Sequence, residues 1–204
     1  MILPTGFSYS EQEDLLYIAM ERCGSKFVRL CFSRADNNTI HNFDNDCLLP
    51  DLTDNILAVM RNPTHRLISA WELMYLKDRQ APNSWWQEQQ LSPPFTPIIN
   101  ASADECIYGF SEFVTQLHEL WEIQELDKFV RPQCDWYHRS DIEYIDISNI
   151  QCHLGLEEDA HEVERVTSIQ PWEYVEDDHI QELMCVMFEE DYIKMDYDPQ
   201  GRDK

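Results

Sequence analysis

Hydrophobic residues in the first third of the chain form two short continuous runs, which predict strands that are covered on both faces. The first run spans residues 15–20, and the second spans residues 56–60 within a strand predicted over residues 55–60. Strands buried on both faces are continuously apolar rather than alternating. Asn62-Pro63 follows the second run, and proline is favoured at the first position of a helix. A helix is therefore predicted from Pro63, with an apolar face of Leu67, Ile68, Trp71, Met74 and Tyr75.

The remaining pattern alternates between helical and strand-like segments. A polar break over 21–25 leads into a predicted helix from Phe27 to about Arg34, and later patterns predict a helix over 110–129, a strand over 142–150 and a helix over 178–189. Alternating strands and helices predict an α/β fold with a central, mostly parallel sheet flanked by helices. A length of 204 residues predicts a single domain over 1–204.

Residues 79–105 are predicted to form one long loop, with four prolines and the pair Trp85-Trp86. Structureless loops of this length are usually functional or disordered. We expect it to lie on the acceptor side of a binding site, although the two tryptophans are equally compatible with packing onto the core.

Charge and composition exclude several classes of protein. The chain has 15 basic and 39 acidic residues and a net charge of −24, so its field repels nucleic acids and anionic membranes. No apolar run approaches the length of a membrane span, and no signal peptide is recognised, which favours a cytoplasmic protein. Five glycines cannot form a GxGxxG or GxxxxGK[ST] loop. The seven cysteines include no CxxC pair, and the histidines lack metal-ligand spacing, so reduced thiols and no metal are expected.

Cations are concentrated near the N-terminus, where two strand–turn–helix segments carry them. Seven of the 15 basic residues precede position 79. The first segment places Arg22-Cys23-Gly24-Ser25-Lys26 between a strand and a helix, and the second places Arg61 directly after a strand. Helix N-termini and the carboxyl ends of strands are sites where anions bind in α/β proteins. The competing interpretations are that the first segment is a purely structural turn and that the arginines of the second are surface residues paired with acids.

These segments resemble those of sulfotransferases that use 3′-phosphoadenosine 5′-phosphosulfate (PAPS). The stretch from Arg61 to Trp71 is similar to the RDPxxRLxSxY segment of that family, nearest the branch with heparan and dermatan 2-O-sulfotransferases. Residues 22–26 are similar to its K-x-G-[ST]-[ST] phosphosulfate loop. Weaker similarities continue to about residue 195: Gly109–Val114, Arg131-Pro132-Gln133-Cys134, Ile142–Ile145 and Phe188–Tyr192.

The resemblance implies a P-loop-like sulfotransferase fold and a set of cofactor-binding residues. Arg61 and Ser69 correspond to the residues that bind the 3′-phosphate. The phosphosulfate would be held by Arg22, Cys23, Gly24, Ser25, Lys26 and Phe27. Arg22 replaces the lysine of the family loop and Lys26 replaces a hydroxyl, so these two cations would also act in catalysis. An alternative register places Glu21 at the lysine position and would indicate a degenerate site.

A histidine is the expected general base. The 2-O-sulfotransferase branch has one about twenty residues before its 3′-phosphate arginine, and His41 precedes Arg61 by twenty residues. Imidazole titrates near neutral pH and suits removal of a hydroxyl proton; a histidine without a role is the alternative. His65 is interpreted as a surface residue.

The resemblance therefore implies sulfuryl transfer from PAPS to a hydroxyl, with adenosine 3′,5′-bisphosphate as product and no metal. The negative charge of the chain favours a small molecule, glycoside or lipid headgroup as the acceptor over a long sulfated polysaccharide. The alternative is a catalytically inactive relative that binds a nucleotide or a partner protein. A P-loop kinase-like protein is disfavoured because no Walker A loop is present.

Overall fold

The chain forms two compact units, each built from two separate stretches of sequence. The first unit comprises Met1–Arg61 and Pro132–Val163, and the second comprises Asn62–Arg131 and Glu164–Lys204. We analysed a computed structural model that describes the following residues: 7–10, 14–18, 23, 40–43, 53–72, 102–122, 130–134, 142–156 and 169–202. The predicted helix from Phe27 to Arg34 and residues 79–101 of the predicted loop lie outside these ranges.

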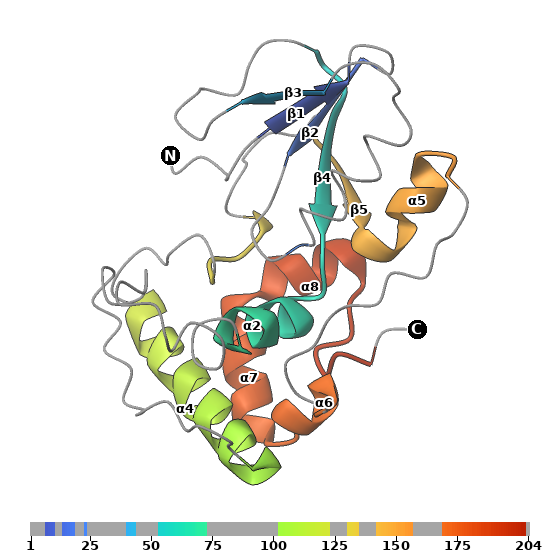
Figure 1. The fold of residues 1–204 in the computed structure, drawn as a ribbon. Coiled ribbons are helices and arrows are strands. Elements are labelled where there is room, and N and C mark those ends of the chain that lie inside the picture. Colours follow the sequence, from blue (N-terminus) through green and yellow to red (C-terminus); the bar gives the residue numbers. More distant parts are fainter. Residues whose placement is uncertain are drawn as a thin grey trace, which may run out of the picture. The chain divides into compact units, whose positions relative to one another are not determined.

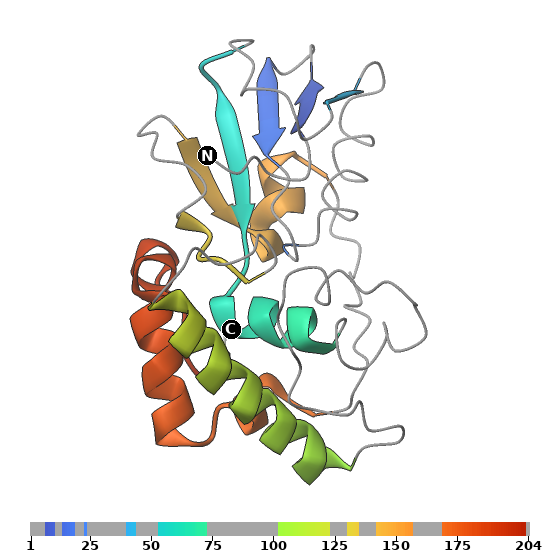
Figure 2. The same cartoon turned by 90° about the vertical axis from the view of Figure 1, so that its left-hand side faces the viewer.

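A five-stranded sheet with the order β3-β1-β2-β4-β5 forms the centre of the first unit (Figures 1 and 2). Its parallel part consists of β2 (Leu15–Ile18), β4 (Ile56–Met60) and β5 (Ile142–Asp146). β1 (Phe7–Ser10) lies beside β2, β3 (Ile40–Phe43) lies beyond β1, and both of these pairings are antiparallel. The α/β prediction is confirmed, and parallel pairing holds for β2, β4 and β5, to which β1 adds an antiparallel strand.

The parts of the two apolar runs that form β2 and β4 are buried on both faces of the sheet, as the sequence predicted. Every residue of β2 and β4 is buried. Leu16 and Ile56 pack in one cluster, whereas Tyr17 and Leu57 pack in another, because side chains alternate along a strand. Ile150, from the short helix α5 (Ile150–His153), belongs to the second cluster. α5 therefore covers one face of the parallel strands.

β5 is shorter than the predicted strand over 142–150. The Asp146 carboxylate accepts a hydrogen bond from the backbone N–H of Ser148 at 2.7 Å and another from the Ser148 hydroxyl. A side chain that caps a free N–H in this way starts a helical turn. The strand consequently ends at Asp146, and a 3-10 turn (Ile147–Asn149) leads into α5.

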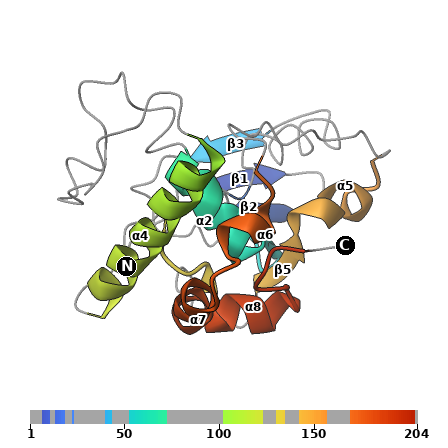
Figure 3. The ribbon, with the colours of Figure 1, turned by 90° about the horizontal axis from the view of Figure 1, so that it is seen from below.

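Helices form the second unit around one aromatic core. They are α2 (Pro63–Trp71), α4 (Ala103–Trp121), α6 (Pro171–Tyr174), α7 (Asp178–Met187) and α8 (Glu189–Met195), and they can be followed in Figure 3. Trp71, Phe110 and Tyr174 meet edge to face, with ring centroids 5.2–6.0 Å apart. Such pairs are favourable beyond their buried area. These rings join α2, α4 and α6 in a single core.

Helix starts follow local capping signals. Pro63 is the first residue of α2 and Asn62 is its N-cap, as predicted, and the helix predicted from 178 is α7. α4 begins seven residues before the predicted start at Phe110. Ser102 and Glu105 form a capping box that satisfies the first N–H groups of this helix. The last three residues of the predicted loop, 103–105, are therefore helical.

Candidate functional site

The strand order marks one edge of the sheet as the place for a ligand. The sheet has the order β3-β1-β2-β4-β5. The strand β3, which comes after β2 along the chain, lies on the β1 side of β2. The strand β5, which comes after β4, lies on the opposite side of the sheet, next to β4. β3 runs parallel to β2, because both are antiparallel to β1. Open α/β sheets bind ligands outside the carboxyl ends of their strands, where the strand order reverses in this way. The candidate site is therefore the carboxyl edge between β2 and β4.

Three residues of the first unit meet at this edge. Cys23 lies in the segment after β2, Arg61 follows the last residue of β4, and Gln133 lies between them. The Cys23 thiol donates to Gln133 Oε1 at 2.8 Å. The backbone N–H of Arg61 donates to the same oxygen at 3.0 Å, and Gln133 Nε2 donates to the Arg61 carbonyl at 2.8 Å. One amide thus occupies both main-chain groups of Arg61, as a neighbouring strand would.

Burial and charge separate the roles of these residues. Cys23 and Gln133 are fully buried, whereas Arg61 is half-buried. The backbone of Arg61 is held by a buried group, and its guanidinium keeps a permanent positive charge within a chain of net charge −24. A guanidinium on a fixed backbone is suited to a phosphate or sulfate group, which it can bind through two parallel hydrogen bonds. The edge can therefore hold an anion.

The residues that follow Arg61 have structural partners in the second unit. The Asn62 side chain accepts from Thr64 N and donates to the Asp198 carbonyl, both at 2.8 Å. The RDP segment of the resembled family has aspartate where this chain has Asn62, and only the amide can donate to Asp198. Thr64 Oγ1 donates to the Pro199 carbonyl at 2.6 Å.

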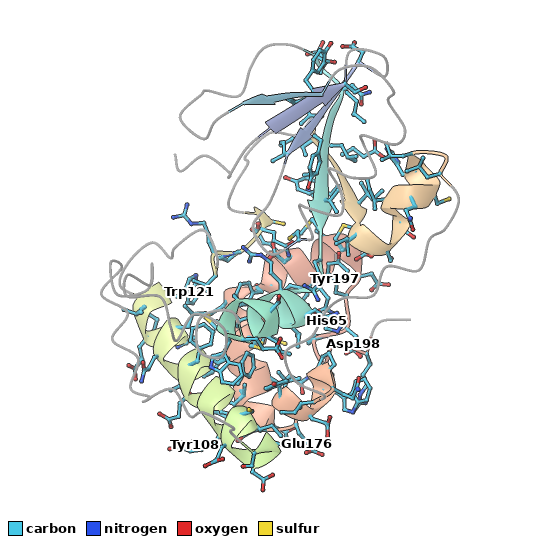
Figure 4. All side chains as sticks on the ribbon, viewed as in Figure 1. His65, Tyr108, Trp121, Glu176, Tyr197 and Asp198 are labelled. Atoms are coloured by element: carbon cyan, nitrogen blue, oxygen red, sulfur yellow. The ribbon has the colours of Figure 1, made fainter. Side chains whose placement is uncertain are left out.

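His65 and Arg66 are also anchored in the second unit. His65 Nε2 lies 2.9 Å from the carbonyl oxygen of Gly201, so the interpretation of His65 as a plain surface residue is wrong. Its imidazole is half-buried and fixes the C-terminal segment that carries Tyr197 and Asp198 (Figure 4). Arg66 is only 1% exposed and donates to the Arg131 carbonyl at 2.6 Å. Arg66 therefore has a structural role.

Ser69 lies on α2 and is half-buried. This serine belongs to the second unit, whereas Arg61 belongs to the first. The convergence of Arg61 and Ser69 on one phosphate stays a prediction.

His41 lies on β3 at some distance from Arg61. The strand register aligns His41 with Tyr9, then Leu16, and then Ile56 at the start of β4. Three strand spacings of about 4.8 Å and five residues of about 3.3 Å separate the Cα atoms of His41 and Arg61 by about 22 Å. The sheet therefore does not bring His41 to Arg61. Its assignment as a general base stays a prediction.

Several predicted site residues lie outside the described parts of the chain. They are Arg22, Gly24, Ser25, Lys26, Phe27, Trp85 and Trp86. Of the predicted phosphosulfate loop, the structure thus places Cys23 alone. Its fully buried thiol donates to Gln133, and the assignment of Cys23 to the cofactor site stays a prediction.

Gln133 is the residue of this edge that sequence reasoning missed. From the sequence, the tetrapeptide Arg131–Cys134 is only one of the weaker family similarities. Gln133 is 72 residues from Arg61 and 110 residues from Cys23, so no local spacing relates the three. A glutamine in an otherwise unremarkable loop carries no signal of burial.

Comparison with protein-family models, curated proteins and solved structures found no match for the chain. Among the described residues, no group of three or more His, Cys, Asp or Glu side chains is arranged to hold a metal ion. No helix in the described part of the chain is long and apolar enough to span a membrane.

Proposed function

We propose that this protein is a sulfotransferase that transfers the sulfuryl group of PAPS to a hydroxyl of a small molecule, glycoside or lipid headgroup. The observation that carries the proposal is the position of Arg61 at the carboxyl edge of β4, where the strand order reverses beside β2. The same edge holds Cys23, from the segment that resembles a phosphosulfate loop. The two segments with family resemblance are thus joined at the edge where α/β proteins bind nucleotides.

Two different groups of residues would bind the two anionic parts of the cofactor. Arg61 and Ser69 would bind the 3′-phosphate, and the turn of Arg22, Gly24, Ser25, Lys26 and Phe27 would bind the phosphosulfate. Bound PAPS supplies an activated sulfuryl group. Group transfer of this kind depends on positioning and on stabilisation of charge at the leaving oxygen, which Arg22 and Lys26 would provide. No metal is needed in this scheme.

His41 would remove the proton of the acceptor hydroxyl in this scheme. A base acts at the sulfuryl end of the cofactor, on the opposite side of the ribose from the 3′-phosphate. It therefore need not touch the group that Arg61 binds. The Cα atoms of His41 and Arg61 are nevertheless about 22 Å apart, by the strand and residue spacings given above. This distance favours testing a second candidate function. That candidate is a relative that binds the nucleotide without transferring sulfate.

Binding of adenosine 3′,5′-bisphosphate, measured by isothermal titration calorimetry, tests the cofactor site. Arg61→Ala removes a charge-assisted contact worth about 1.5–3 kcal/mol, so Kd should rise roughly 10–150-fold. Ser69→Ala should act in the same direction but less, because a neutral hydroxyl contributes less than a guanidinium. Arg202→Ala removes an equal charge from an exposed position and serves as the control. Unchanged binding by Arg61→Ala would overturn the proposal.

Transfer from labelled PAPS to a panel of hydroxyl acceptors separates an enzyme from a binding protein. If His41 is the base, His41→Ala should lower kcat by roughly 10²–10⁴-fold and leave bisphosphate binding nearly unchanged. Tight bisphosphate binding by the wild-type protein with no transfer to any acceptor would favour the non-catalytic candidate. Full turnover by His41→Ala would move the search for the base to other residues.

A further inference from the structure

We propose that Gln133 is a positioning residue, which holds Cys23, after β2, and Arg61, at the end of β4, at a fixed spacing for a ligand with two phosphate-type groups. The inference rests on the proposed function, because it concerns the same edge of the sheet. Gln133 itself would touch no ligand. Its side chain is fully buried and hydrogen-bonds to both Cys23 and Arg61.

The orientation of the Gln133 amide is determined by its partners. Arg61 N–H and the Cys23 thiol are both donors, and both lie within 3.0 Å of Oε1. The Arg61 carbonyl is an acceptor, and it lies 2.8 Å from Nε2. A flipped amide would place its N–H₂ group against the N–H of Arg61 and against the thiol. The amide oxygen is thus the acceptor that both segments share.

This arrangement connects the residue Cys23, after β2, with the end of β4. Among the described residues, the pairing of β2 with β4 extends to Ile18 and Ala58. Cys23 and Arg61 come later along the chain than these paired residues, and the Gln133 side chain hydrogen-bonds to both of them. Gln133 bridges them with a single rigid planar group. A ligand that binds both segments would depend on this bridge for the spacing between its two contacts.

A purely structural role makes a different prediction from a positioning role. A buried amide that only stabilises the first unit would lower stability without changing which ligands bind. Replacement of a residue that sets the spacing between two anion contacts must change how well the protein discriminates between ligands with one phosphate and ligands with two. The ratio of affinities for adenosine 3′,5′-bisphosphate and adenosine 5′-monophosphate therefore separates the two roles.

The test compares Gln133→Met with Gln151→Met by calorimetry, at a temperature where circular dichroism shows both variants folded. Gln151 is the matched control, because it is a buried glutamine of the same unit on α5. Displacement of a bound group by about 1 Å can cost as much as 100-fold, so Gln133→Met should reduce the affinity ratio by about 10–100-fold. Gln151→Met should leave the ratio within about twofold of the wild type by the same reasoning, since Gln151 lies on α5 and belongs to neither segment.

Gln133→Glu gives a second measurement if the methionine variant fails to fold. A protonated carboxyl has one donor and one acceptor oxygen, like the amide, whereas a carboxylate can only accept. Because burial raises the pKa of a carboxyl, the affinity ratio of Gln133→Glu should be reduced at pH 8 and move toward the wild-type ratio as the pH is lowered and the carboxyl is protonated. Each value is compared with the wild type at the same pH, which cancels titration of the ligand phosphates.

Three outcomes would overturn the inference. The first is a wild-type affinity ratio in both Gln133 variants at pH 8, and the second is an equal loss of the ratio in Gln151→Met. In either case bisphosphate binding that still depends on Arg61 leaves the proposed function intact. The third outcome, no bisphosphate binding by the wild-type protein, refutes the proposed function itself.

Discussion

The N-cap of α2 offers a measurable test of how the second unit is held together. Asn62 is 1% exposed, and its side chain makes two hydrogen bonds of 2.8 Å in opposite roles. Its oxygen accepts from Thr64 N and so caps the helix, whereas its nitrogen donates to the carbonyl of Asp198 in the C-terminal segment. Asn62→Ala removes both bonds, and Asn62→Ser keeps a capping oxygen but lacks the donor.

The expected losses in free energy of unfolding follow from the two hydrogen bonds of the Asn62 side chain. Loss of an N-cap side chain costs about 1 kcal/mol, within a range of about 0.5–2. Loss of the donor to the half-buried Asp198 carbonyl costs about 1 kcal/mol more. Asn62→Ala should therefore lower the free energy of unfolding by about 2 kcal/mol, and Asn62→Ser by about half of that, since serine caps a helix as well as asparagine does.

Urea denaturation followed by circular dichroism measures these differences, and hydrogen exchange at the Thr64 amide reports the local opening of the first turn. Asn149→Ala is the control, because Asn149 occupies the N-cap position of α5 without making a side-chain capping bond. It should change stability by less than about 0.5 kcal/mol, as an exposed substitution without a specific contact does. An equally small change in the free energy of unfolding for Asn62→Ala would contradict this role of Asn62. So would an Asn62→Ser variant that is as destabilised as Asn62→Ala.

Other contacts lead to further expectations. Gly201 has φ +68° and a Cβ there would lie 3.0 Å from Pro171 Cβ, so Gly201→Ala should lower the thermal midpoint more than Gly155→Ala, which has the same backbone strain (φ +64°) but open space. Equal shifts would show that crowding against Pro171 is unimportant. Arg66→Met leaves the Arg131 carbonyl without its 2.6 Å donor and should reduce the free energy of unfolding by about 1–3 kcal/mol in urea titrations; an unchanged midpoint would contradict this. Hydrogen bonds from the Ser102 backbone and hydroxyl lower the pKa of the Glu105 carboxyl below 4.5. The stabilisation of α4 by Glu105 should therefore be complete above pH 4.5 and lost as the pH falls through the lowered pKa, and an NMR titration should show this pKa rising in Ser102→Ala.

Several elements could be predicted from the sequence because their signals are local. The strands β2 and β4 were evident as continuous apolar runs, and the start of α2 followed from Asn62-Pro63. The early start of α4 was also locally encoded, in Ser102 and Glu105, although the apolar pattern alone placed the start at Phe110. The end of β5 was encoded in the same way by the capping carboxylate of Asp146. These features depend on residues within a few positions of one another, where side-chain type and backbone geometry are directly coupled.

The order of the strands was decided by the tertiary structure. No local pattern specifies that β1 inserts between β2 and β3, because pairing partners are chosen by the burial of whole faces. That insertion places His41 in register with Ile56, at the other end of β4 from Arg61. A separation of twenty residues along the chain carried no information on this distance.

The sequence by itself thus determined the α/β class, the buried strands β2 and β4, and the position of Arg61 after β4. Only the tertiary structure assigned Gln133 to Cys23 and Arg61, and His65 to Gly201. Each of these contacts joins residues more than 70 positions apart. A polar side chain is bound to such a distant partner because burial leaves main-chain groups that must be satisfied, and which groups these are depends on the complete fold.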